Sequence, residues 1–378
     1  MRTTLGATHH HRQTPEPPAG QPAGRQPVHT VYIPADRFDA GTVSELGTAA
    51  ARLLDTRFDA EALGLTSDDQ AFAGLVRSRV AAKLAAEPVE DVRIDFEDGY
   101  GVRPDGQEDA DVGRAVEAVA AMAAGKTLPR RWGLRIKSFA DGHADRALRT
   151  LDGFLTGIAD ATGGLPEGFT VTFPKVTRAE YLDEFERFLE ALERSLGLPD
   201  GTLRFEMQVE TTQTVMFLLA GRGRTPRLAA AHFGVFDYTA SCGLPPEEQR
   251  LDHPACDFAR HVMQVAFAGT GVELSDGSTN LVPASEAAAD VHAVWRTHSA
   301  LVRHSLSHGF HQGWDMHPAH LVSRFATVYA FHLARQAGYT ARVSAYQEQA
   351  EQSGLLEEPA TIRALSAILR RGTDCGAF

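Results

Sequence analysis

Short apolar runs alternate with longer amphipathic segments along most of the chain. Eight of these runs have the length and the β-branched or aromatic content of strands. They span residues 29–34, 92–96, 132–137, 169–174, 203–210, 230–237, 271–276 and 313–316. We therefore expect eight β-strands.

The segments between these runs carry the 3.6-residue periodicity of helices that pack one face against a core. Clear examples are residues 110–124, 146–160 and 179–196. Strands that alternate with helices form parallel sheets, and eight such units fit a closed barrel better than an open sheet. The pattern thus predicts an α/β fold, a (β/α)8 TIM barrel.

Three segments lie outside these units. Residues 1–27 are rich in Pro, Gly, Gln and Thr and predict a disordered leader. The long connection at 36–90 predicts a helical insertion after the first strand that shapes one wall of the site. Further helices are expected at 318–336, 341–353 and 359–371. The predicted domains are a catalytic barrel at 28–335 and a C-terminal helical extension at 336–378, packed on the barrel or on a neighbouring subunit.

Composition narrows the classes of function. The 378 residues carry a net charge of -12, and because nucleic acids bind clustered Lys and Arg, no nucleic-acid partner is expected. No apolar run reaches the roughly 18 residues that span a bilayer, and the N-terminus lacks a secretory apolar region, so no membrane partner is expected. Three widely spaced cysteines fit no disulfide framework and indicate a cytoplasmic protein.

Polar and ionisable residues follow nearly every predicted strand. In parallel barrels the active site lies at the C-terminal ends of the strands. The residues at these ends include Arg37, Glu97, Asp98, Arg135, Lys175, Glu210, Thr211, Asp237, Asp276 and His317. We therefore expect a carboxylate-rich active site at one mouth of the barrel.

Several carboxylates at one mouth would repel each other unless a cation lies among them. Hard oxygen ligands suit Mg²⁺ or Mn²⁺. Glu210 and Asp237 follow adjacent strands, so these two residues are the predicted metal ligands. The alternative is that Glu210 caps the helix that follows it.

Two cationic residues at the strand ends have two interpretations each. Arg135 could stabilise an enolate or bind a carboxylate through two hydrogen bonds. It could also form a structural ion pair with Glu97 or Asp98. Lys175 could form a Schiff base, but beside so many carboxylates an ion pair or a substrate contact is favoured.

Seven histidines lie between residues 292 and 320. His304, His308 and His311 could line one helix face, which would permit a second metal site. Zinc-type spacing is not met, however, and solvated or helix-capping histidines are favoured. His317 precedes a proline at a strand end and is a candidate general base.

Taken in order, the strand ends resemble the HpcH/HpaI aldolase and citrate lyase β-subunit family. This family belongs to the phosphoenolpyruvate/pyruvate-binding barrel superfamily, which also includes malate synthase. The similar segments are residues 31–38, 94–104, 134–139, 173–180, 208–215, 234–244 and 308–321. The chain departs from the family pattern at Ala35, where glycine is usual, and at Lys137, where asparagine is usual.

The resemblance implies a site in which Glu210 and Asp237 bind the metal and Arg135 acts on the substrate. The general base would be a metal-bound water steered by Asp98 and Glu97, or else His317. Further substrate contacts are expected at Arg37, Lys175, Thr211 and Asp276.

The resemblance also implies a reaction class: a metal-dependent carbon–carbon lyase of the aldolase type, acting on a 2-oxo acid through a metal-stabilised pyruvate-type enolate. The alternatives are a citrate lyase-like acyl-coenzyme A lyase, synthase or thioesterase, a phosphoenolpyruvate-handling transferase, and a non-catalytic metabolite-binding barrel. The expected partner is a small carboxylic or 2-oxo acid, or its coenzyme A thioester. By analogy, a homo-oligomer is expected.

Overall fold

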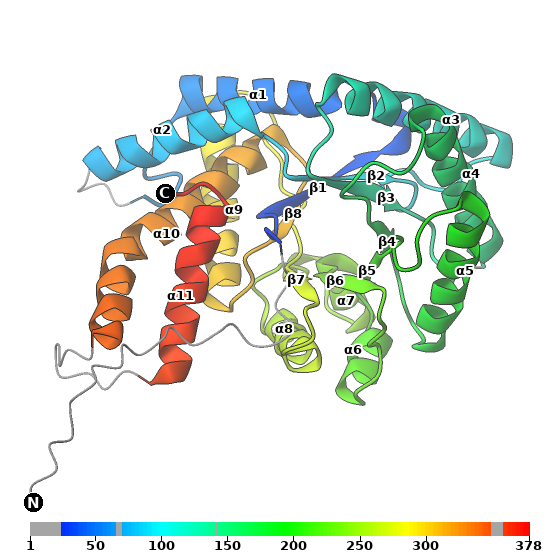
Figure 1. The fold of residues 1–378 in the computed structure, drawn as a ribbon. Helices are drawn as coiled ribbons and strands as arrows, with labels where there is room; N and C mark the ends of the chain where they lie inside the picture. The colour runs from blue at the N-terminus through cyan, green and yellow to red at the C-terminus, as the bar shows by residue number, and fades with distance from the viewer. Residues whose placement is uncertain (1–23, 66–69, 141, 349–357) are drawn as a thin grey trace, which may run out of the picture.

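Eight parallel strands form the centre of the structure, a computed structural model that describes residues 24–65, 70–140, 142–348 and 358–378. The first seven strands pair in the order of the sequence, and the eighth pairs with the first (Figure 1). The strands are β1 (His29–Pro34), β2 (Asp91–Asp95), β3 (Arg131–Arg135), β4 (Val171–Phe173), β5 (Phe205–Val209), β6 (Leu228–Phe233), β7 (Glu273–Ser275) and β8 (Gly313–Asp315).

The two remaining sheet edges meet where β7 approaches β8. Ser275 bridges Gln312 in parallel fashion, and the backbone N–H of Asp276 donates to the carbonyl of Gln312 at 2.8 Å. These contacts close the sheet, and closure satisfies the backbone groups that an open edge would leave unpaired. The predicted (β/α)8 barrel is confirmed.

Helices surround the barrel and bury their apolar faces against it. They are α1 (Thr42–Arg57), α2 (Gln70–Ala86), α3 (Asp105–Gly125), α4 (Ala144–Thr162), α5 (Glu180–Leu196), α6 (Thr212–Leu219), α7 (Val235–Ser241), α8 (Pro254–Phe267), α9 (Ala288–Ser307), α10 (Pro318–Gln347) and α11 (Pro359–Asp374). In α5, Phe185 and Leu189 are fully buried, one turn apart on the same face. None of the helices in the described ranges is long and apolar enough to cross a membrane.

The predicted insertion after the first strand consists of α1 and α2, which run side by side in Figure 1. Both helices also pack on α10. The insertion is therefore held between the barrel and the C-terminal helices, which gives α1 a fixed position beside the barrel mouth.

Two expectations about element boundaries are wrong, and a third is not tested. The predicted helices at 318–336 and 341–353 are one continuous helix as far as Gln347, so α10 runs across the predicted domain boundary. Asp237 lies in α7 and not at the end of a strand. The predicted leader falls outside the described residues except at 24–27, where Arg25 pairs with Glu87 at 2.9 Å.

The barrel interior contains a charged network in place of a purely apolar core. Arg93 donates two hydrogen bonds to Glu206, at 3.1 and 2.8 Å, and also pairs with Asp91. His232 Nε2 lies 3.2 Å from the same Glu206 carboxylate. All four side chains are at most 1% exposed. Buried charges persist when they are paired in this way.

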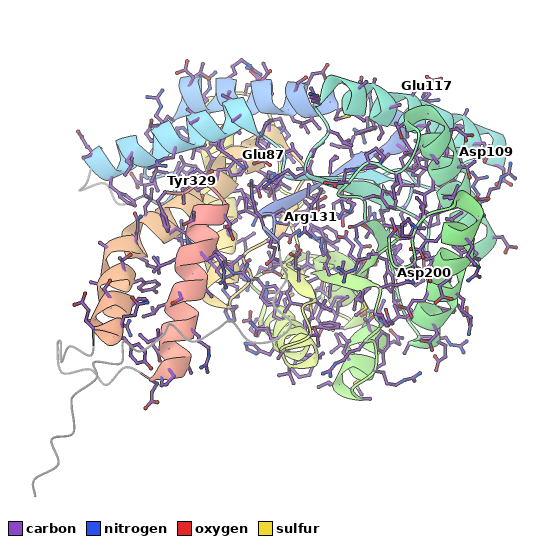
Figure 2. The ribbon with its side chains drawn as sticks, viewed as in Figure 1. Glu87, Asp109, Glu117, Arg131, Asp200 and Tyr329 are labelled. Atoms are coloured by element: carbon purple, nitrogen blue, oxygen red, sulfur yellow. The ribbon has the colours of Figure 1, made fainter. Side chains whose placement is uncertain are left out.

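Carboxylates occur both on the outer surface and in paired positions at the ends of the barrel. Glu117 and Asp200 are exposed at the periphery in Figure 2, whereas Arg131 lies near the centre of the view. Arg131, at the start of β3, donates two hydrogen bonds to Glu273 at 2.6 and 2.9 Å. This pair joins β3 to β7 across the N-terminal end of the barrel.

Candidate active site

Six of the predicted site residues meet at the C-terminal ends of strands β2 to β6. They are Glu97, Asp98, Arg135, Lys175, Glu210 and Asp237. They come from five consecutive strand ends, because Glu97 and Asp98 both follow β2. The six side chains come together because the strands are parallel and in register. The predicted carboxylate-rich mouth therefore exists as a set of neighbouring side chains.

Lys175 is the centre of this cluster. Its ammonium group donates to Glu97 and to Asp98, the latter at 2.7 Å, and lies 3.7 Å from Asp237. Its backbone N–H donates to Glu210 Oε1 at 2.6 Å. The backbone of Lys175 has φ of 47°, a left-handed conformation that costs energy for a non-glycine residue. The cluster therefore stabilises an unfavourable backbone conformation.

Arg135 is held by a residue that the sequence analysis missed. Asp95, at the end of β2, accepts from Arg135 Nε at 2.7 Å and from Nη2 at 2.6 Å. The remaining nitrogen, Nη1, lies 3.4 Å from Glu97. The guanidinium also lies over the ring of Tyr32, 4.9 Å from its centroid. Asp95 and Arg135 are direct partners in the register of β2 and β3. Knowledge of this register would have identified Asp95.

The mouth has more carboxylates than cations, and this excess sets its electrostatics. Burial and the charge of Glu97 raise the pKa of Glu210 to about 8. Burial also raises the pKa of Glu97 to about 7, although Arg135 and Lys175 act against the rise. The pKa of Asp237 is raised as well, first by burial and also by Asp98. Such shifts are typical of functional sites.

The excess of carboxylates also raises the pKa of Lys175. Burial acts to lower the pKa of its ammonium, but the charges of Glu97 and Glu210 raise that pKa overall. The amine therefore stays protonated at neutral pH and is a poor nucleophile. This favours the ion-pair interpretation of Lys175 over a Schiff base.

The donor set fits a hard divalent cation. Glu210 is 2% exposed and shares the mouth with Glu97, Asp98 and Asp237, all oxygen donors of the type that Mg²⁺ and Mn²⁺ prefer. Gly234 leaves the room that the Glu210 carboxylate occupies, because a Cβ at residue 234 would lie 2.5 Å from Glu210 Oε2. The pair Glu210 and Asp237 thus remains the predicted ligand pair.

A cavity of about 740 Å³ opens beside this cluster. Arg135 and Asp98 form part of its wall, and α1 contributes Glu45 and Leu46, so the insertion does line the site as expected. Arg37 lies at the rim, is exposed, and has no ion-pair partner among the described residues. The cavity has the size of a site for a small-molecule ligand.

Two predicted substrate-binding residues, Thr211 and Asp276, form hydrogen bonds outside the cluster around Lys175. Thr211 caps α6, accepting from the backbone of Thr214 at 3.2 Å, so the capping role falls to Thr211 and not to Glu210. Asp276 is fully buried and accepts from Arg260 and Ser305. Substrate contacts by Thr211 and Asp276 stay predictions.

His317 caps helix α10. Its Nδ1 accepts from the backbone N–H of Ala319 at 3.1 Å, so the neutral ring carries its proton on Nε2. Burial and His320 lower the pKa of His317. A neutral histidine whose free nitrogen is already used as a cap is a weaker candidate for the general base than the mouth carboxylates.

The fold is similar to those of several solved structures. A citrate lyase from Burkholderia xenovorans LB400 has a TM-score of 0.61 at 19% identity, with 93% of each chain covered. A malate synthase from Haloferax volcanii has a TM-score of 0.56 at 14% identity, covering 92% of this chain and 99% of that one. An HpcH/HpaI aldolase/citrate lyase family protein from Burkholderia cenocepacia J2315 has a TM-score of 0.46 at 15% identity, covering 85% and 96%.

The citrate lyase and the malate synthase share the barrel fold of this chain, so the resemblance inferred from the strand ends is confirmed at the level of the fold. No curated protein sequence matches the chain. One family profile does match, described as Domain of unknown function (DUF6986), over residues 9–378. Because the match spans nearly the whole chain, the protein belongs to the DUF6986 family.

Proposed function

We propose that the protein is a metal-dependent carbon–carbon lyase of the aldolase type that acts on a 2-oxo acid. The observation that carries the proposal is the charge balance of the barrel mouth. Glu97, Asp98, Glu210 and Asp237 surround Lys175 next to Arg135, and the pKa of Glu210 is raised to about 8. A site so short of positive charge is suited to a dication and an anionic substrate.

Glu210 and Asp237 would hold Mg²⁺ or Mn²⁺ in this proposal. The bound ion would supply Lewis acidity toward the keto and carboxylate oxygens of a 2-oxo acid. The Haloferax volcanii malate synthase has been solved with magnesium and glyoxylate, and with pyruvate and acetyl-coenzyme A. Those ligands belong to that protein, and they make the same chemistry a reasonable first test on this barrel.

Arg135 would bind the substrate and take up negative charge. Asp95 fixes two of its nitrogens, whereas Nη1 has only the longer ion pair with Glu97, at 3.4 Å, so Nη1 is the nitrogen that would bind the substrate. A guanidinium held in place before the reaction stabilises charge that develops on a substrate oxygen without costly reorganisation. Cleavage of a carbon–carbon bond beside a keto group develops such charge.

Glu97 is the group best placed to hold and move a proton. The pKa of Glu97 is raised to about 7, near the pH at which a general acid or base is most effective. Lys175, which donates to the Glu97 carboxylate, remains protonated and holds that carboxylate in position. In this proposal Lys175 therefore orients Glu97 and makes no covalent bond to the substrate.

A citrate lyase-like reaction on a coenzyme A thioester is the second candidate, and the cavity favours it. About 740 Å³ is far more space than a three-carbon acid fills. Arg37, exposed at the rim without an ion-pair partner among the described residues, could bind a phosphate or a distal carboxylate there.

Calorimetric titration of Mg²⁺ tests the metal site, with and without pyruvate or oxaloacetate. We expect binding to wild type, strengthened by the 2-oxo acid, and its loss in the double variant Glu210→Gln, Asp237→Asn. The matched control is Asp109→Asn, because in the described part of the chain Asp109 pairs with Arg146 and Arg149 on the outer helices and not with the mouth. No Mg²⁺ binding to wild type, or binding that survives the double substitution, would sink the proposal.

Turnover assays then separate the two candidate reactions. Oxaloacetate and 4-hydroxy-2-oxo acids would be compared with malyl- and citramalyl-coenzyme A, each with and without chelator. Chelator-sensitive cleavage of the free acids supports the aldolase. Turnover of the thioesters alone, weakened by Arg37→Ala, supports the citrate lyase-like reaction and rejects the aldolase.

A further inference from the structure

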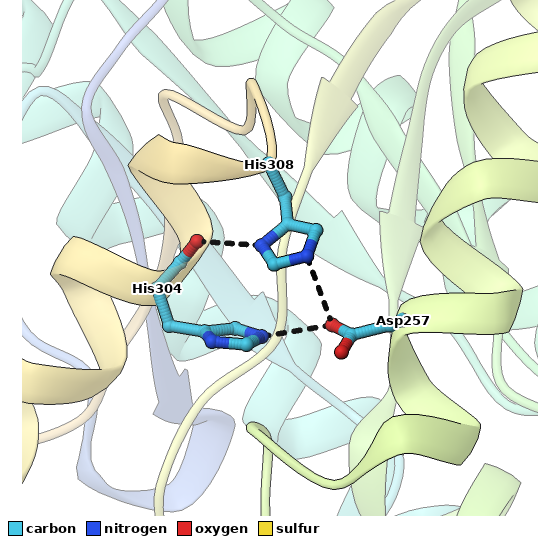
Figure 3. A group of neighbouring side chains, drawn as sticks. All are labelled: Asp257, His304 and His308. Carbon is cyan, nitrogen blue, oxygen red and sulfur yellow. Dashed lines mark hydrogen bonds and ion pairs between the residues drawn. The ribbon is translucent and has the colours of Figure 1, made fainter.

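A second group of metal-ligand residues lies outside the mouth. Asp257 comes from α8, His304 from the last turn of α9, and His308 is the residue that caps the C-terminus of α9 (Figure 3). Their potential ligand atoms all lie within 4.8 Å of one another. None of the three residues lines the 740 Å³ cavity. Histidines four residues apart on one helix face are well spaced to share a metal ion.

The distances suit a shared ion better than direct hydrogen bonds alone. His308 Nε2 lies 3.6 Å from Asp257 Oδ1, which is too long for a hydrogen bond. Two ligands of one tetrahedral Zn²⁺, with bonds of about 2.0 Å, lie about 3.3 Å apart. His304 Nε2 lies 2.8 Å from the same oxygen, a hydrogen bond that a bound ion would replace.

The backbone sets the tautomer of His308. Its Nδ1 lies 3.0 Å from the carbonyl oxygen of His304, which can only accept, so Nδ1 carries the proton. The neutral ring then directs the lone pair of Nε2 toward the carboxylate of Asp257 (Figure 3). Metal-binding histidines characteristically donate their other ring N–H to a carbonyl or carboxylate, which fixes the ring and favours binding.

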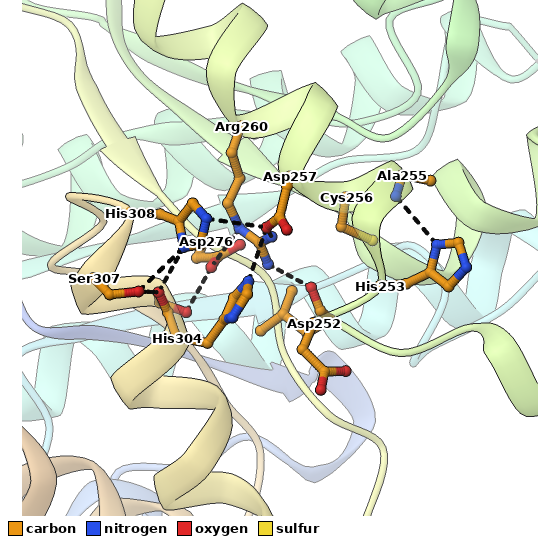
Figure 4. Close-up of polar contacts among 12 residues, drawn as sticks. Asp252, His253, Ala255, Cys256, Asp257, Arg260, Asp276, His304, Ser307 and His308 are labelled. Atoms are coloured by element: carbon orange, nitrogen blue, oxygen red, sulfur yellow. Dashed lines mark hydrogen bonds and ion pairs between the residues drawn. The ribbon is translucent and has the colours of Figure 1, made fainter.

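The surroundings hold the carboxylate in place. Arg260 donates to Asp257 Oδ1 at 2.6 Å, and its charge is balanced by the fully buried Asp276, 2.9 Å from Arg260 Nε (Figure 4). A hydrogen bond of this kind orients a ligating carboxylate without occupying its second oxygen. The hydrogen bond from His304 and the charge of Arg260 lower the pKa of Asp257 overall, although burial acts to raise it.

We propose that Asp257, His304 and His308 form a binding site for a transition-metal dication of the Zn²⁺ class. Two imidazoles and one carboxylate are the ligands that Zn²⁺ and its neighbours accept, whereas Mg²⁺ prefers oxygen alone. The site is distinct in position and in donor chemistry from the all-oxygen mouth.

The fourth position is open to water or to a neighbouring side chain. His261 lies one turn beyond Asp257 on α8 and is exposed. Its ring centroid lies 5.7 Å from that of His308. The two helices therefore present matching pairs, Asp257 with His261 and His304 with His308.

An occupied site would clamp α8 to α9 next to the mouth. Arg260 of α8 and Ser305 of α9 both donate to Asp276, at 2.9 and 2.5 Å. Asp276 is two residues before Ser278, which lines the cavity. The ion would thus fix the relative position of the two helices that hold this strand end.

The test is titration of the full chain with Co²⁺, whose visible absorption reports a site with nitrogen ligands, and with Zn²⁺ in competition. All proteins would carry Glu210→Gln and Asp237→Asn to remove the mouth site. They would also carry Ala at His9, His10 and His11, because three consecutive histidines bind transition metals by themselves. We expect one equivalent of Co²⁺ to bind and to be displaced by Zn²⁺.

Adding His308→Gln or His304→Gln should weaken Co²⁺ binding by more than about 100-fold, beyond the loss caused by removing an outer hydrogen-bond partner. The matched control is His292→Gln, on the same helix, where Nε2 bonds to the carbonyl of Arg57. Unchanged thermal unfolding without metal shows that each variant folds, and Zn²⁺ should raise the unfolding temperature only when His304 and His308 are both present. Co²⁺ affinity that is equal in the His308→Gln and His292→Gln proteins would overturn the proposal.

Discussion

Glu206 lies near the start of β5, and Glu210 comes directly after the last residue of that strand. The two side chains are 1% and 2% exposed. Their electrostatics are nevertheless opposite. The pKa of Glu206 is lowered to about 2, because Arg93 and His232 outweigh the effect of burial. The pKa of Glu210 is raised to about 8, because burial acts together with the charges of Glu97 and Asp237. Burial alone therefore does not decide the charge state of a carboxylate.

The difference separates a structural region from a reactive one. Glu206 accepts two hydrogen bonds from Arg93, and its charge is part of what holds the barrel interior together. Among the described residues, Glu210 accepts a backbone N–H from Lys175 and no hydrogen bond from a cationic side chain. The charges of Glu97 and Asp237 raise its pKa, and those of Lys175 and Arg135 do not offset the effect of burial. Between Glu206 and Glu210, Gln208 is fully buried, and neither end of its amide has a partner in the described part of the chain. A neutral side chain separates the two regions.

The largest expected effect is the loss of the interior charge. Glu206→Gln removes the partner of a fully buried Arg93, and breaking one side of such a pair typically costs about 3–5 kcal/mol. Urea denaturation at pH 7 in the presence of chelator would measure this loss. Glu180→Gln, which removes an exposed carboxylate bonded to Arg222, should leave the midpoint unchanged. Equal stability of the two variants would show that the charge of Glu206 does not stabilise the barrel interior.

A change at Gly234 should damage the mouth without touching the interior. In Gly234→Ala, the added Cβ would lie 2.5 Å from Glu210 Cβ and must displace that side chain. Overpacking of this kind costs about 1–3 kcal/mol, and Mg²⁺ binding should be lost. Gly113→Ala on α3, where the added Cβ has open space, is the control. Calorimetry that finds Mg²⁺ affinity preserved in Gly234→Ala would show that the position of Glu210 is not critical.

The smallest expected effect is an increase in stability, whereas the first was a loss. Removing the ionisable group with Glu210→Gln should stabilise the metal-free protein at pH 8, by about 1 kcal/mol or more. Thermal unfolding with chelator at several pH values would measure it. Replacing glutamate with glutamine is thus expected to destabilise the protein at residue 206 and to stabilise it at residue 210.

The pH dependence follows from the raised pKa. A glutamate has a pKa of about 4.3 in the unfolded chain, whereas Glu210 in the folded protein has a pKa of about 8. The folded state binds more protons between these values, so this contribution to stability is complete below about 4.3 and is lost as the pH rises through about 8. The advantage of Glu210→Gln should therefore shrink as the pH falls and approach zero below about pH 4. An advantage that is constant with pH would point to packing in place of charge.

Much of this architecture was predictable from the sequence. The eight strands follow from short β-branched runs, and β1 has the predicted bounds. The mouth residues follow from the rule that parallel strands end on one side. Lys175 and its carboxylates were correctly assigned to one region, because they follow strands that end on the same side of the barrel.

The rest depended on packing that no local pattern records. Asp95 was missed because its partner Arg135 is 40 residues away and only strand register brings them together. The continuity of α10 was missed because Gly338 lies within a predicted break. One glycine costs a helix only about 1 kcal/mol, which contacts with α1, α9 and α11 offset. The cavity wall formed by α1 also required the tertiary structure.

Helix α10 joins two very different environments in a single element. Every residue from Ala319 to Tyr329 is buried, whereas in the following half only His332 and Ala345 are. Amide hydrogens in the first half should exchange with deuterium only when the whole barrel unfolds, and those in the second half through local opening. A helix of about 45 Å would then carry a gradient of exchange rates, slowest next to the barrel mouth.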